Sequence, residues 1–164
     1  ALIVTISPKD FGLNPLDGVK FQQALETKAY LLGNGLIPTQ TFKDYLENVS
    51  TTKFGHINPI TKGNYTLTNL NSLFPDYINI SLKEAIQHFD KIIPGYADPD
   101  AIIQAVESRT SSPLRIPRNS QGESSISGLY PCGEGSGYAG GITSAAIDGI
   151  KIAESLAKIY KPFQ

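Results

Sequence analysis

Gly128-Leu-Tyr-Pro-Cys-Gly-Glu-Gly-Ser-Gly-Tyr-Ala-Gly-Gly-Ile-Thr-Ser-Ala-Ala146 is the stretch on which the fold prediction depends. Its first residues, up to Cys132, form a short apolar run that is typical of a buried strand. Glycines around one carboxylate, Glu134, follow this run, and helical spacing of apolar residues begins at Ile142. A strand, a glycine-rich turn and a helix N-terminus in this order are an arrangement that holds phosphates and nucleotide cofactors.

The helix that begins at Ile142 is predicted from an unusually regular pattern on one face. Several positions of this face are small, so the helix could approach a sheet or another backbone closely. The predicted face consists of Ala145, Ala146, Gly149, Ile150, Ala153, Leu156, Ala157 and Tyr160.

Composition excludes several classes of protein. A chain of 164 residues with 40% hydrophobic residues can form one domain with its own core and a smaller lobe beside it. Its net charge of −1, without a basic tail, argues against nucleic acid as a partner. No apolar run is long enough to cross a membrane, so no membrane partner is predicted. The single cysteine, Cys132, excludes an intrachain disulfide and is typical of a reducing compartment, which predicts a cytoplasmic location.

The sequence contains no methionine, not even at position 1. Natural reading frames begin with methionine, and this one opens on an apolar, strand-like run. We therefore expect a fragment of a longer polypeptide, in which the missing N-terminal part of the same chain supplies part of the site.

Upstream of the glycine-rich stretch, the pattern is mostly helical. A strand is predicted over residues 1–6, which are rich in β-branched side chains. The first helix follows the cap Asn14 and the proline after it, and ends at Gly33-Asn34-Gly35. Further helical segments are predicted at 40–47 with Thr39 as cap, at 67–74, and at 76–93 with Asp76 as cap.

The pattern becomes extended after the last of these helices. Residues 101–106 and 114–117 are predicted as strands, and residues 119–127 as a polar turn. Residues 48–66 lack periodicity and are predicted to form a surface loop.

Two interpretations of the glycines remain open from the residues themselves. Gly135 to Gly140 has the spacing G-x-G-x-x-G of a dinucleotide site, but the second strand of the usual unit is not predicted before Gln164. A tight turn with close helix packing needs no ligand at all. Glu134 favours a ligand, because a carboxylate at the end of a buried strand needs a hydrogen-bond donor, which a sugar or ribityl hydroxyl would supply.

A known family shares these residues. Leu129-Tyr-Pro-Cys-Gly-Glu134, the glycines after it and Asp148-Gly149 resemble the C-terminal signature of FAD-dependent dehydrogenases, in particular the bacterial NAD(FAD)-utilising dehydrogenase type. The resemblance is specific from about Val106 to Ala157 and looser upstream. It implies that Gly133 and Glu134 bind the flavin ribityl chain, with Glu134 accepting from its hydroxyls. It further implies that Gly140, Gly141 and Ile142 lie against the pyrophosphate or the flavin ring.

A second segment resembles the same family. Glu107-Ser-Arg-Thr-Ser-Ser-Pro-Leu-Arg-Ile-Pro-Arg118 contains all the arginines of the chain. Arg109, beside the hydroxyls of Thr110, Ser111 and Ser112, is predicted to bind a substrate carboxylate, a phosphate or the flavin carbonyls. The alternative is a solvated edge strand whose charges prevent aggregation.

The predicted fold class is α+β. Residues 1–105 would form a cap or substrate lobe, mostly helical with an N-terminal strand, and residues 106–164 would return to an FAD-binding, Rossmann-like domain. The resemblance implies FAD in the full-length protein, hydride transfer with a small-molecule substrate, and NAD(P)H as a candidate electron donor. A nucleotide- or anion-binding module, or an interaction domain without catalysis, is the alternative. No metal site is predicted, because His56 and His88 have no paired ligand spacing.

Overall fold

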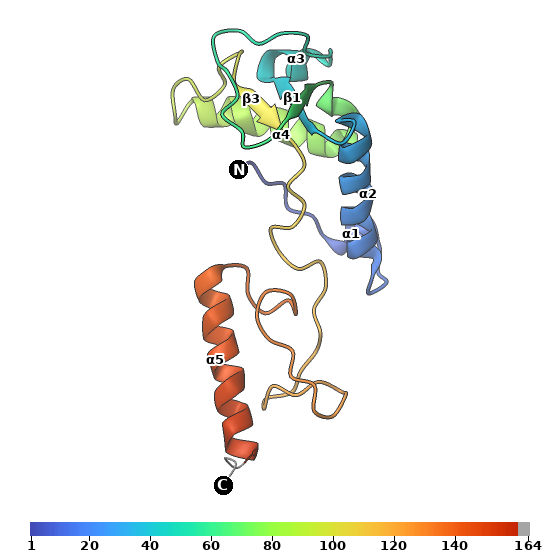
Figure 1. Cartoon of the computed structure of the whole chain (residues 1–164), viewed down its shortest axis with the longest axis vertical. Coiled ribbons are helices and arrows are strands. Elements are labelled where there is room, and N and C mark those ends of the chain that lie inside the picture. Colours follow the sequence, from blue (N-terminus) through green and yellow to red (C-terminus); the bar gives the residue numbers. More distant parts are fainter. Residues whose placement is uncertain (161–164) are drawn as a thin grey trace. The chain divides into compact units, whose positions relative to one another are not determined.

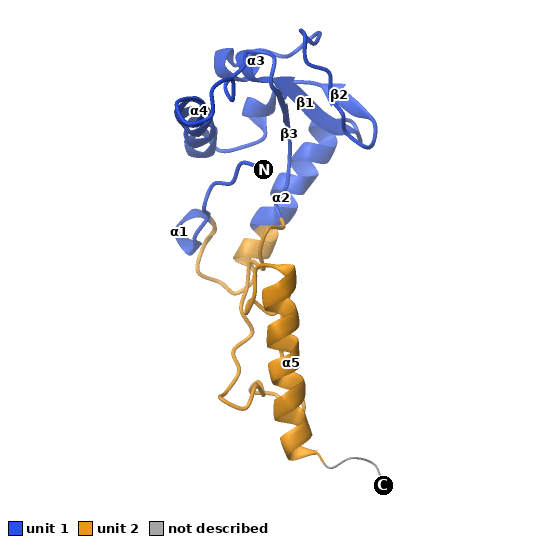
Figure 2. Cartoon of the chain, turned by 90° about the vertical axis from the view of Figure 1, so that its left-hand side faces the viewer, with its two compact units in different colours: residues 1–10, 21–108 blue, residues 11–20, 109–164 orange. Residues whose placement is uncertain are grey.

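The computed structural model describes residues 1–160, which fold into two compact units (Figures 1 and 2). Unit 1 consists of residues 1–10 and 21–108, and unit 2 of residues 11–20 together with the chain from residue 109 onward. None of the described helices is long and apolar enough to cross a membrane.

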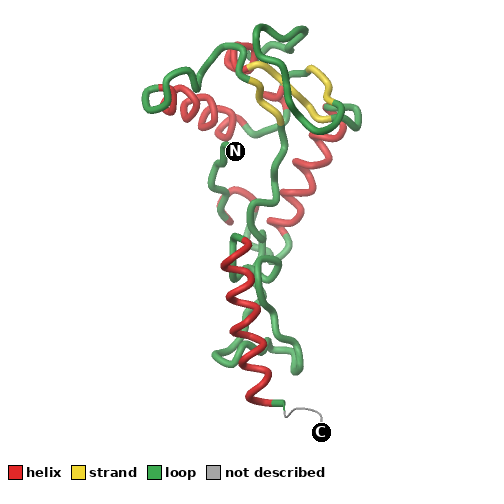
Figure 3. Tube along the Cα trace, turned by 60° about the vertical axis from the view of Figure 1, so that its left-hand side comes forward, coloured by secondary structure: helices red, strands yellow, loops and turns green. Residues whose placement is uncertain are grey.

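Unit 1 contains a three-stranded mixed sheet in the order β2-β1-β3. The central strand β1 (Ile37–Thr41) pairs in parallel with β2 (Tyr65–Leu67) and antiparallel with β3 (Ile102–Gln104), all drawn in yellow in Figure 3. Strands far apart in the sequence therefore meet on both sides of β1.

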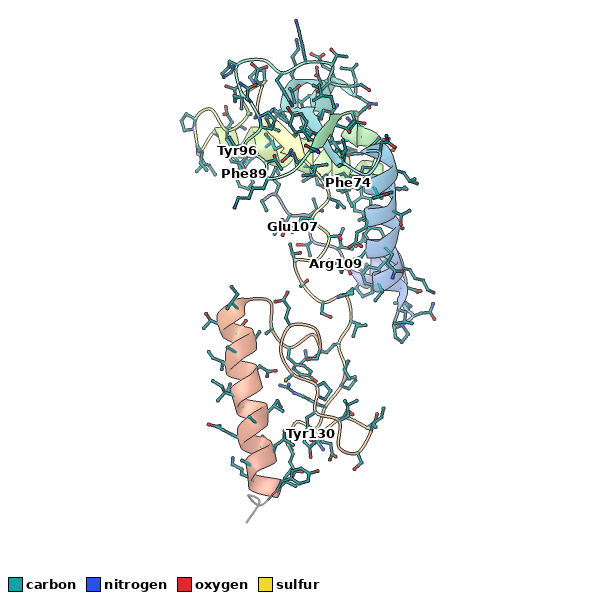
Figure 4. All side chains as sticks on the ribbon, in the orientation of Figure 1. Phe74, Phe89, Tyr96, Glu107, Arg109 and Tyr130 are labelled. Carbon is teal, nitrogen blue, oxygen red and sulfur yellow. The ribbon has the colours of Figure 1, made fainter. Side chains whose placement is uncertain are left out.

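The helices are α1 Pro8–Phe11, α2 Asp17–Leu32, α3 Phe42–Glu47, the 3-10 turn η1 Leu70–Ser72, and α4 Asp76–Asp90. All of them except α1, which buries no residue, supply the core of unit 1. The buried members of this core are Ala29, Phe42, Tyr45, Leu70, Leu73 and Ile86. At the end of α4, the rings of Phe89 and Tyr96 stack edge-on with centroids 5.6 Å apart (Figure 4).

A buried amide stabilises the centre of unit 1. The side chain of Gln40, on β1, is fully buried, which would be costly without hydrogen-bond partners. Its Nε2 donates to the Val49 carbonyl at 2.5 Å, and its Oε1 accepts from the Leu70 N–H at 2.7 Å. The Gln40 side chain thus links β1 both to the loop after α3 and to the start of η1.

Unit 2 contains one long helix, α5 (Ile142–Ile159), preceded by the irregular segment 109–141 (Figure 3). Ile152 is the buried residue of α5, and Ala145, Asp148 and Leu156 on the same side are half-buried.

The α+β class and the helices α2, α4 and α5 are confirmed, but two details of the helix starts are wrong. Residues 37–41 form β1 rather than the start of a helix, and Thr41, not Thr39, caps α3 by accepting from the Asp44 N–H. Asp76 lies in the first turn of α4, whose cap residue is Pro75. Tertiary pairing with β2 and β3 therefore overrides the local helical pattern.

Three predicted strands are absent from the described residues. Residues 1–6 have the burial alternation of a strand, with Leu2, Val4 and Ile6 half-buried, but no strand pairs with them. Residues 114–117 and 129–132 are irregular. Pro117 and Pro131 lack the N–H that a sheet requires, and Leu129 is 44% exposed.

The predicted apolar face of α5 is buried only in part. Ala145, Gly149 and Leu156 are half-buried, but Ala146, Ala153 and Ala157 are exposed, as are Ile150 at 59% and Tyr160 at 58%. The residues of unit 2 cover one side of α5 and leave the other, which is also apolar, in contact with solvent.

Candidate functional site

The glycine-rich turn of residues 133–138 has its own hydrogen bonds. The Gly133 carbonyl accepts from the Tyr138 N–H at 3.1 Å and from the Ser136 hydroxyl at 3.1 Å. The Gly137 N–H donates to the Glu134 carbonyl at 2.9 Å. Gly133 and Gly137 have φ values of +73° and +84°, which side chains other than glycine rarely adopt. These bonds and angles hold the turn in one conformation.

The segment of residues 112–116 also supports the turn. The Ser112 hydroxyl lies 3.1 Å from the Gly135 carbonyl, and the Ile116 N–H donates to the Ser136 carbonyl at 3.1 Å. A Cβ on Gly137 would collide with the Leu114 carbonyl, so glycine allows this close approach. The segment 112–116 is therefore the support of the turn.

A single carboxylate ties the turn to α5. Asp148 accepts from Arg118 through both oxygens, at 2.9 Å (Nη1 to Oδ2) and 2.6 Å (Nη2 to Oδ1), and from the Gly133 N–H at 2.8 Å. Arg118 Nη1 also donates to the Pro131 carbonyl at 2.7 Å. We call this group the Asp148 clamp: Arg118, Pro131, Gly133 and Asp148. Bidentate pairs of this kind are the strongest that Arg makes.

The Asp148 clamp is largely shielded from solvent. The side chains of Arg118 and Asp148 are 14% and 13% exposed. The hydrogen bonds from Arg118 and from the Gly133 N–H lower the pKa of Asp148 to about 2, and Asp148 raises the pKa of Arg118. Both groups are therefore charged throughout the physiological range.

The ring of Tyr138, at the end of the turn, contacts two arginines. The guanidinium carbon of Arg118 lies 3.5 Å from the ring centroid, and that of Arg115 lies 4.1 Å from it. Cation–π contact of this type restrains both arginines. The Arg115 residue is exposed, so its charge faces solvent beside the turn.

Glu134 and the first residues of α5 have polar groups without a described hydrogen-bond partner, unlike the rest of the turn. Glu134 is half-buried, and its carboxylate has no hydrogen-bond or ion-pair partner within residues 1–160. The N–H groups that begin α5 have no intrahelical acceptor, and its cap residue Gly141 provides no side chain. Ile142 is 93% exposed. These are the groups through which the segment could bind a ligand.

Three glycines here have no conformational or steric reason to be glycine. Gly135, Gly140 and Gly141 lie outside the left-handed φ region. A Cβ would meet nothing within 4 Å at Gly135 or Gly140, and at Gly141 only the Ser144 hydroxyl at 3.8 Å. The described chain would therefore accept alanine at each position.

The other predicted residues lie on the irregular chain after β3. Glu107 and Arg109 are labelled there in Figure 4. Arg109, Thr110 and Ser111 are all exposed. Of the predicted hydroxyl residues, Ser112 is the one with a described hydrogen bond to the glycine-rich turn. The structure thus brings Gly133 and Glu134 together with α5, since a Cβ on Gly133 would lie 3.9 Å from that of Ala145.

Two groups of interacting residues are missed by sequence reasoning. The first is the Asp148 clamp, in which Arg118 and Asp148 lie 30 residues apart. The second, in unit 1, is His56, whose Nδ1 lies 2.6 Å from Asp100 Oδ2 and whose Nε2 lies 3.3 Å from Asp98 Oδ2. Ligand atoms of these three residues lie within 4.8 Å of one another, so they are of the type that can hold a metal ion. An imidazole held between two carboxylates accounts for both contacts without a metal ion.

Comparison with known proteins places the chain in a family. Residues 1–110 match the family described as FAD-dependent protein, C-terminal domain-like. An uncharacterised protein of Clostridium beijerinckii is 48% identical over 164 residues, which are 98% of this chain and 31% of that relative. The chain therefore spans less than a third of the relative's length. Because the family match covers more than half of the sequence, the chain belongs to the FAD-dependent protein, C-terminal domain-like family.

Proposed function

We propose that this chain is the C-terminal part of a flavin-dependent oxidoreductase, a dehydrogenase that transfers hydride between bound FAD and a small organic substrate. Membership of an FAD-dependent protein family supports the cofactor. The length of the relative supports a longer polypeptide, whose N-terminal part would bind the ADP portion of FAD. NAD(P)H is the proposed electron donor, and the cytoplasm the proposed location.

The observation that carries the proposal is the open space beside Glu134. Gly133 and Gly137 are explained by their φ values, whereas Gly135, Gly140 and Gly141 are explained by nothing in the described chain. Glycine costs stability through its conformational freedom, so a series of unneeded glycines points to something that must approach the backbone closely. A cofactor lying along residues 133–142 would occupy this space.

The polar groups at this space suit a flavin nucleotide. The half-buried Glu134 carboxylate can accept hydrogen bonds from ribityl hydroxyls, which would compensate its burial. The N–H groups at the start of α5 present the positive end of a helix dipole, which favours the negative charge of a pyrophosphate or of a reduced flavin ring. FAD, when bound, supplies the redox chemistry, and these residues supply position and electrostatics.

The exposed side of α5 supports a covering segment from the same polypeptide. Ile147 is 48% exposed and Ile150 59% exposed, and Ala146, Ala153 and Ala157 are exposed on the same helix. An apolar helix side of this size is normally covered by another segment. We propose that this side of α5 packs into the FAD-binding, Rossmann-like domain. Residues 1–105 would then form the cap or substrate lobe.

Arg109 is the proposed clamp for a substrate carboxylate or for the flavin carbonyls, with the hydroxyls of Thr110 and Ser111 as additional donors. If Arg109→Ala left the turnover of every tested carboxylate substrate unchanged, this role would be refuted.

The test is the flavin content of the full-length protein. We expect the purified wild type to show flavin absorption, and Glu134→Ala and Gly140→Ala to retain less FAD because they bind it more weakly, while their melting temperatures without FAD stay within about 2 °C of the wild type. The control is Gly128→Ala, at an open, exposed position outside the turn. That variant carries left-handed strain, since φ is +78°, but should retain FAD.

The outcomes distinguish the candidate functions. A folded full-length protein that takes up no FAD would overturn the flavin proposal. Binding of ADP alone would then favour a nucleotide-binding module, and binding of neither would favour an interaction domain. Full FAD retention by Gly140→Ala would remove that glycine from the site.

A further inference from the structure

The Asp148 clamp connects the two parts of the segment that the proposed cofactor site uses. Asp148 lies on α5, less than two turns after its first residue, Ile142. Its Oδ2 accepts the N–H of Gly133, the residue directly before Glu134. One carboxylate therefore holds the start of the helix and the backbone beside Glu134 in a common frame.

The clamp also determines which backbone groups remain available. The Gly133 N–H is used by Asp148, and the Gly133 carbonyl by Ser136 and Tyr138. The turn cannot rotate about Gly133 without breaking these bonds, so the direction of the Glu134 side chain is restricted. The Glu134 carboxylate itself remains without a partner within residues 1–160.

The charges within the clamp balance. A second unpaired carboxylate, in addition to Glu134, would add to the repulsion of an anionic cofactor at the start of α5. Arg118 neutralises Asp148 through two hydrogen bonds and is held from its other side by the ring of Tyr138. Asp148 can thus hold the turn without placing net negative charge at the site.

We propose that Asp148 is a positioning residue of the FAD site, which acts by placing Glu134 relative to the N-terminus of α5. This inference rests on the proposed function. It extends that function by assigning affinity for the cofactor to a residue that does not touch it, and Arg118 to the support of that residue.

A double-mutant cycle tests the proposal in the full-length protein. FAD affinity is measured by the quenching of flavin fluorescence on titration of the apoprotein, for the wild type, Asp148→Asn, Glu134→Ala and the double variant. We expect Asp148→Asn to weaken FAD binding about tenfold in the wild-type background, and less than about threefold in the Glu134→Ala background. Asparagine has the same shape and can still accept the Gly133 N–H, but it has no charge and only one acceptor oxygen, so the bidentate ion pair with Arg118 is lost.

Two further variants make the result specific. Arg118→Lys keeps the charge but loses the bidentate geometry. Like Asp148→Asn, it should weaken FAD binding more in the wild-type background than in the Glu134→Ala background. Glu84→Gln removes an exposed carboxylate from α4, in unit 1 and outside the proposed site, and should leave FAD affinity within about twofold.

Each failure has its own meaning. Equal losses from Asp148→Asn in both backgrounds would mean that Asp148 acts independently of Glu134, which overturns the inference and leaves the flavin function intact. A lowered melting temperature with unchanged FAD affinity would also overturn it, because that is the result of a purely structural role. A wild-type protein that binds no FAD would overturn both proposals.

Discussion

Replacing Asp148 by asparagine should destabilise unit 2 in a way that depends on pH. In the folded protein, Arg118 and the Gly133 N–H lower the pKa of Asp148 from 3.8 to about 2. A difference of this size corresponds to about 2.4 kcal/mol of preferential stabilisation of the charged form. The side chains of the pair remain 14% and 13% exposed, so solvent screening reduces this value, and we expect about 1–2 kcal/mol.

The sign follows from the direction of the pKa shift. A carboxyl group whose pKa is lower in the folded state stabilises it fully above the unfolded-state pKa, and this contribution is lost as the pH falls through the folded-state value. The free energy of unfolding of the wild type should therefore exceed that of Asp148→Asn by about 1–2 kcal/mol at pH 7. The difference should decline below about pH 5, be mostly lost near pH 2, where Asp148 is half protonated, and vanish near about pH 1, below both pKa values.

The measurement is urea unfolding followed by circular dichroism at several pH values, for the wild type and the variant in parallel. Other carboxylates titrate equally in both proteins, so the difference between them isolates Asp148. Glu154→Gln, on the exposed side of α5, is the control and should differ from the wild type by less than about 0.5 kcal/mol. A difference for Asp148→Asn that stays constant from pH 7 to about pH 2 would refute the electrostatic reasoning.

Two further substitutions test the frame of each unit. Gln40→Ala should lower the free energy of unfolding of unit 1 by about 2–4 kcal/mol in denaturant titrations, because the buried N–H of Leu70 loses its acceptor and a cavity remains. The exposed Gln87→Ala should change it by less than about 0.5 kcal/mol, and equal effects at both positions would contradict the role of the buried amide. Gly137→Ala should destabilise unit 2 by more than Gly128→Ala, because both have positive φ but only Gly137 also meets the backbone of residue 114. Equal melting temperatures for the two alanine variants would exclude the steric explanation.

The local features of this protein follow from its sequence. The helices α2, α4 and α5 are predicted by apolar spacing, because a helix forms its hydrogen bonds within its own segment. The glycine-rich turn with Glu134 is likewise visible as a short motif, because positive φ angles at Gly133 and Gly137 require that residue type. Sequence reasoning thus predicted the helix α5, and the role of the turn before it as a site stays a prediction.

Tertiary structure alone decided the pairings. Residues 1–6 are rich in β-branched side chains, but no strand within residues 1–160 pairs with them. Residues 37–41, with three buried polar side chains, form the central strand because β2 and β3 lie beside them. A strand completes its hydrogen bonds only with another strand, so its sequence cannot determine whether it forms. The same reason applies to the Asp148 clamp. Arg118 and Asp148 are 30 residues apart, and their charges meet only because the folded turn brings Gly133 against α5.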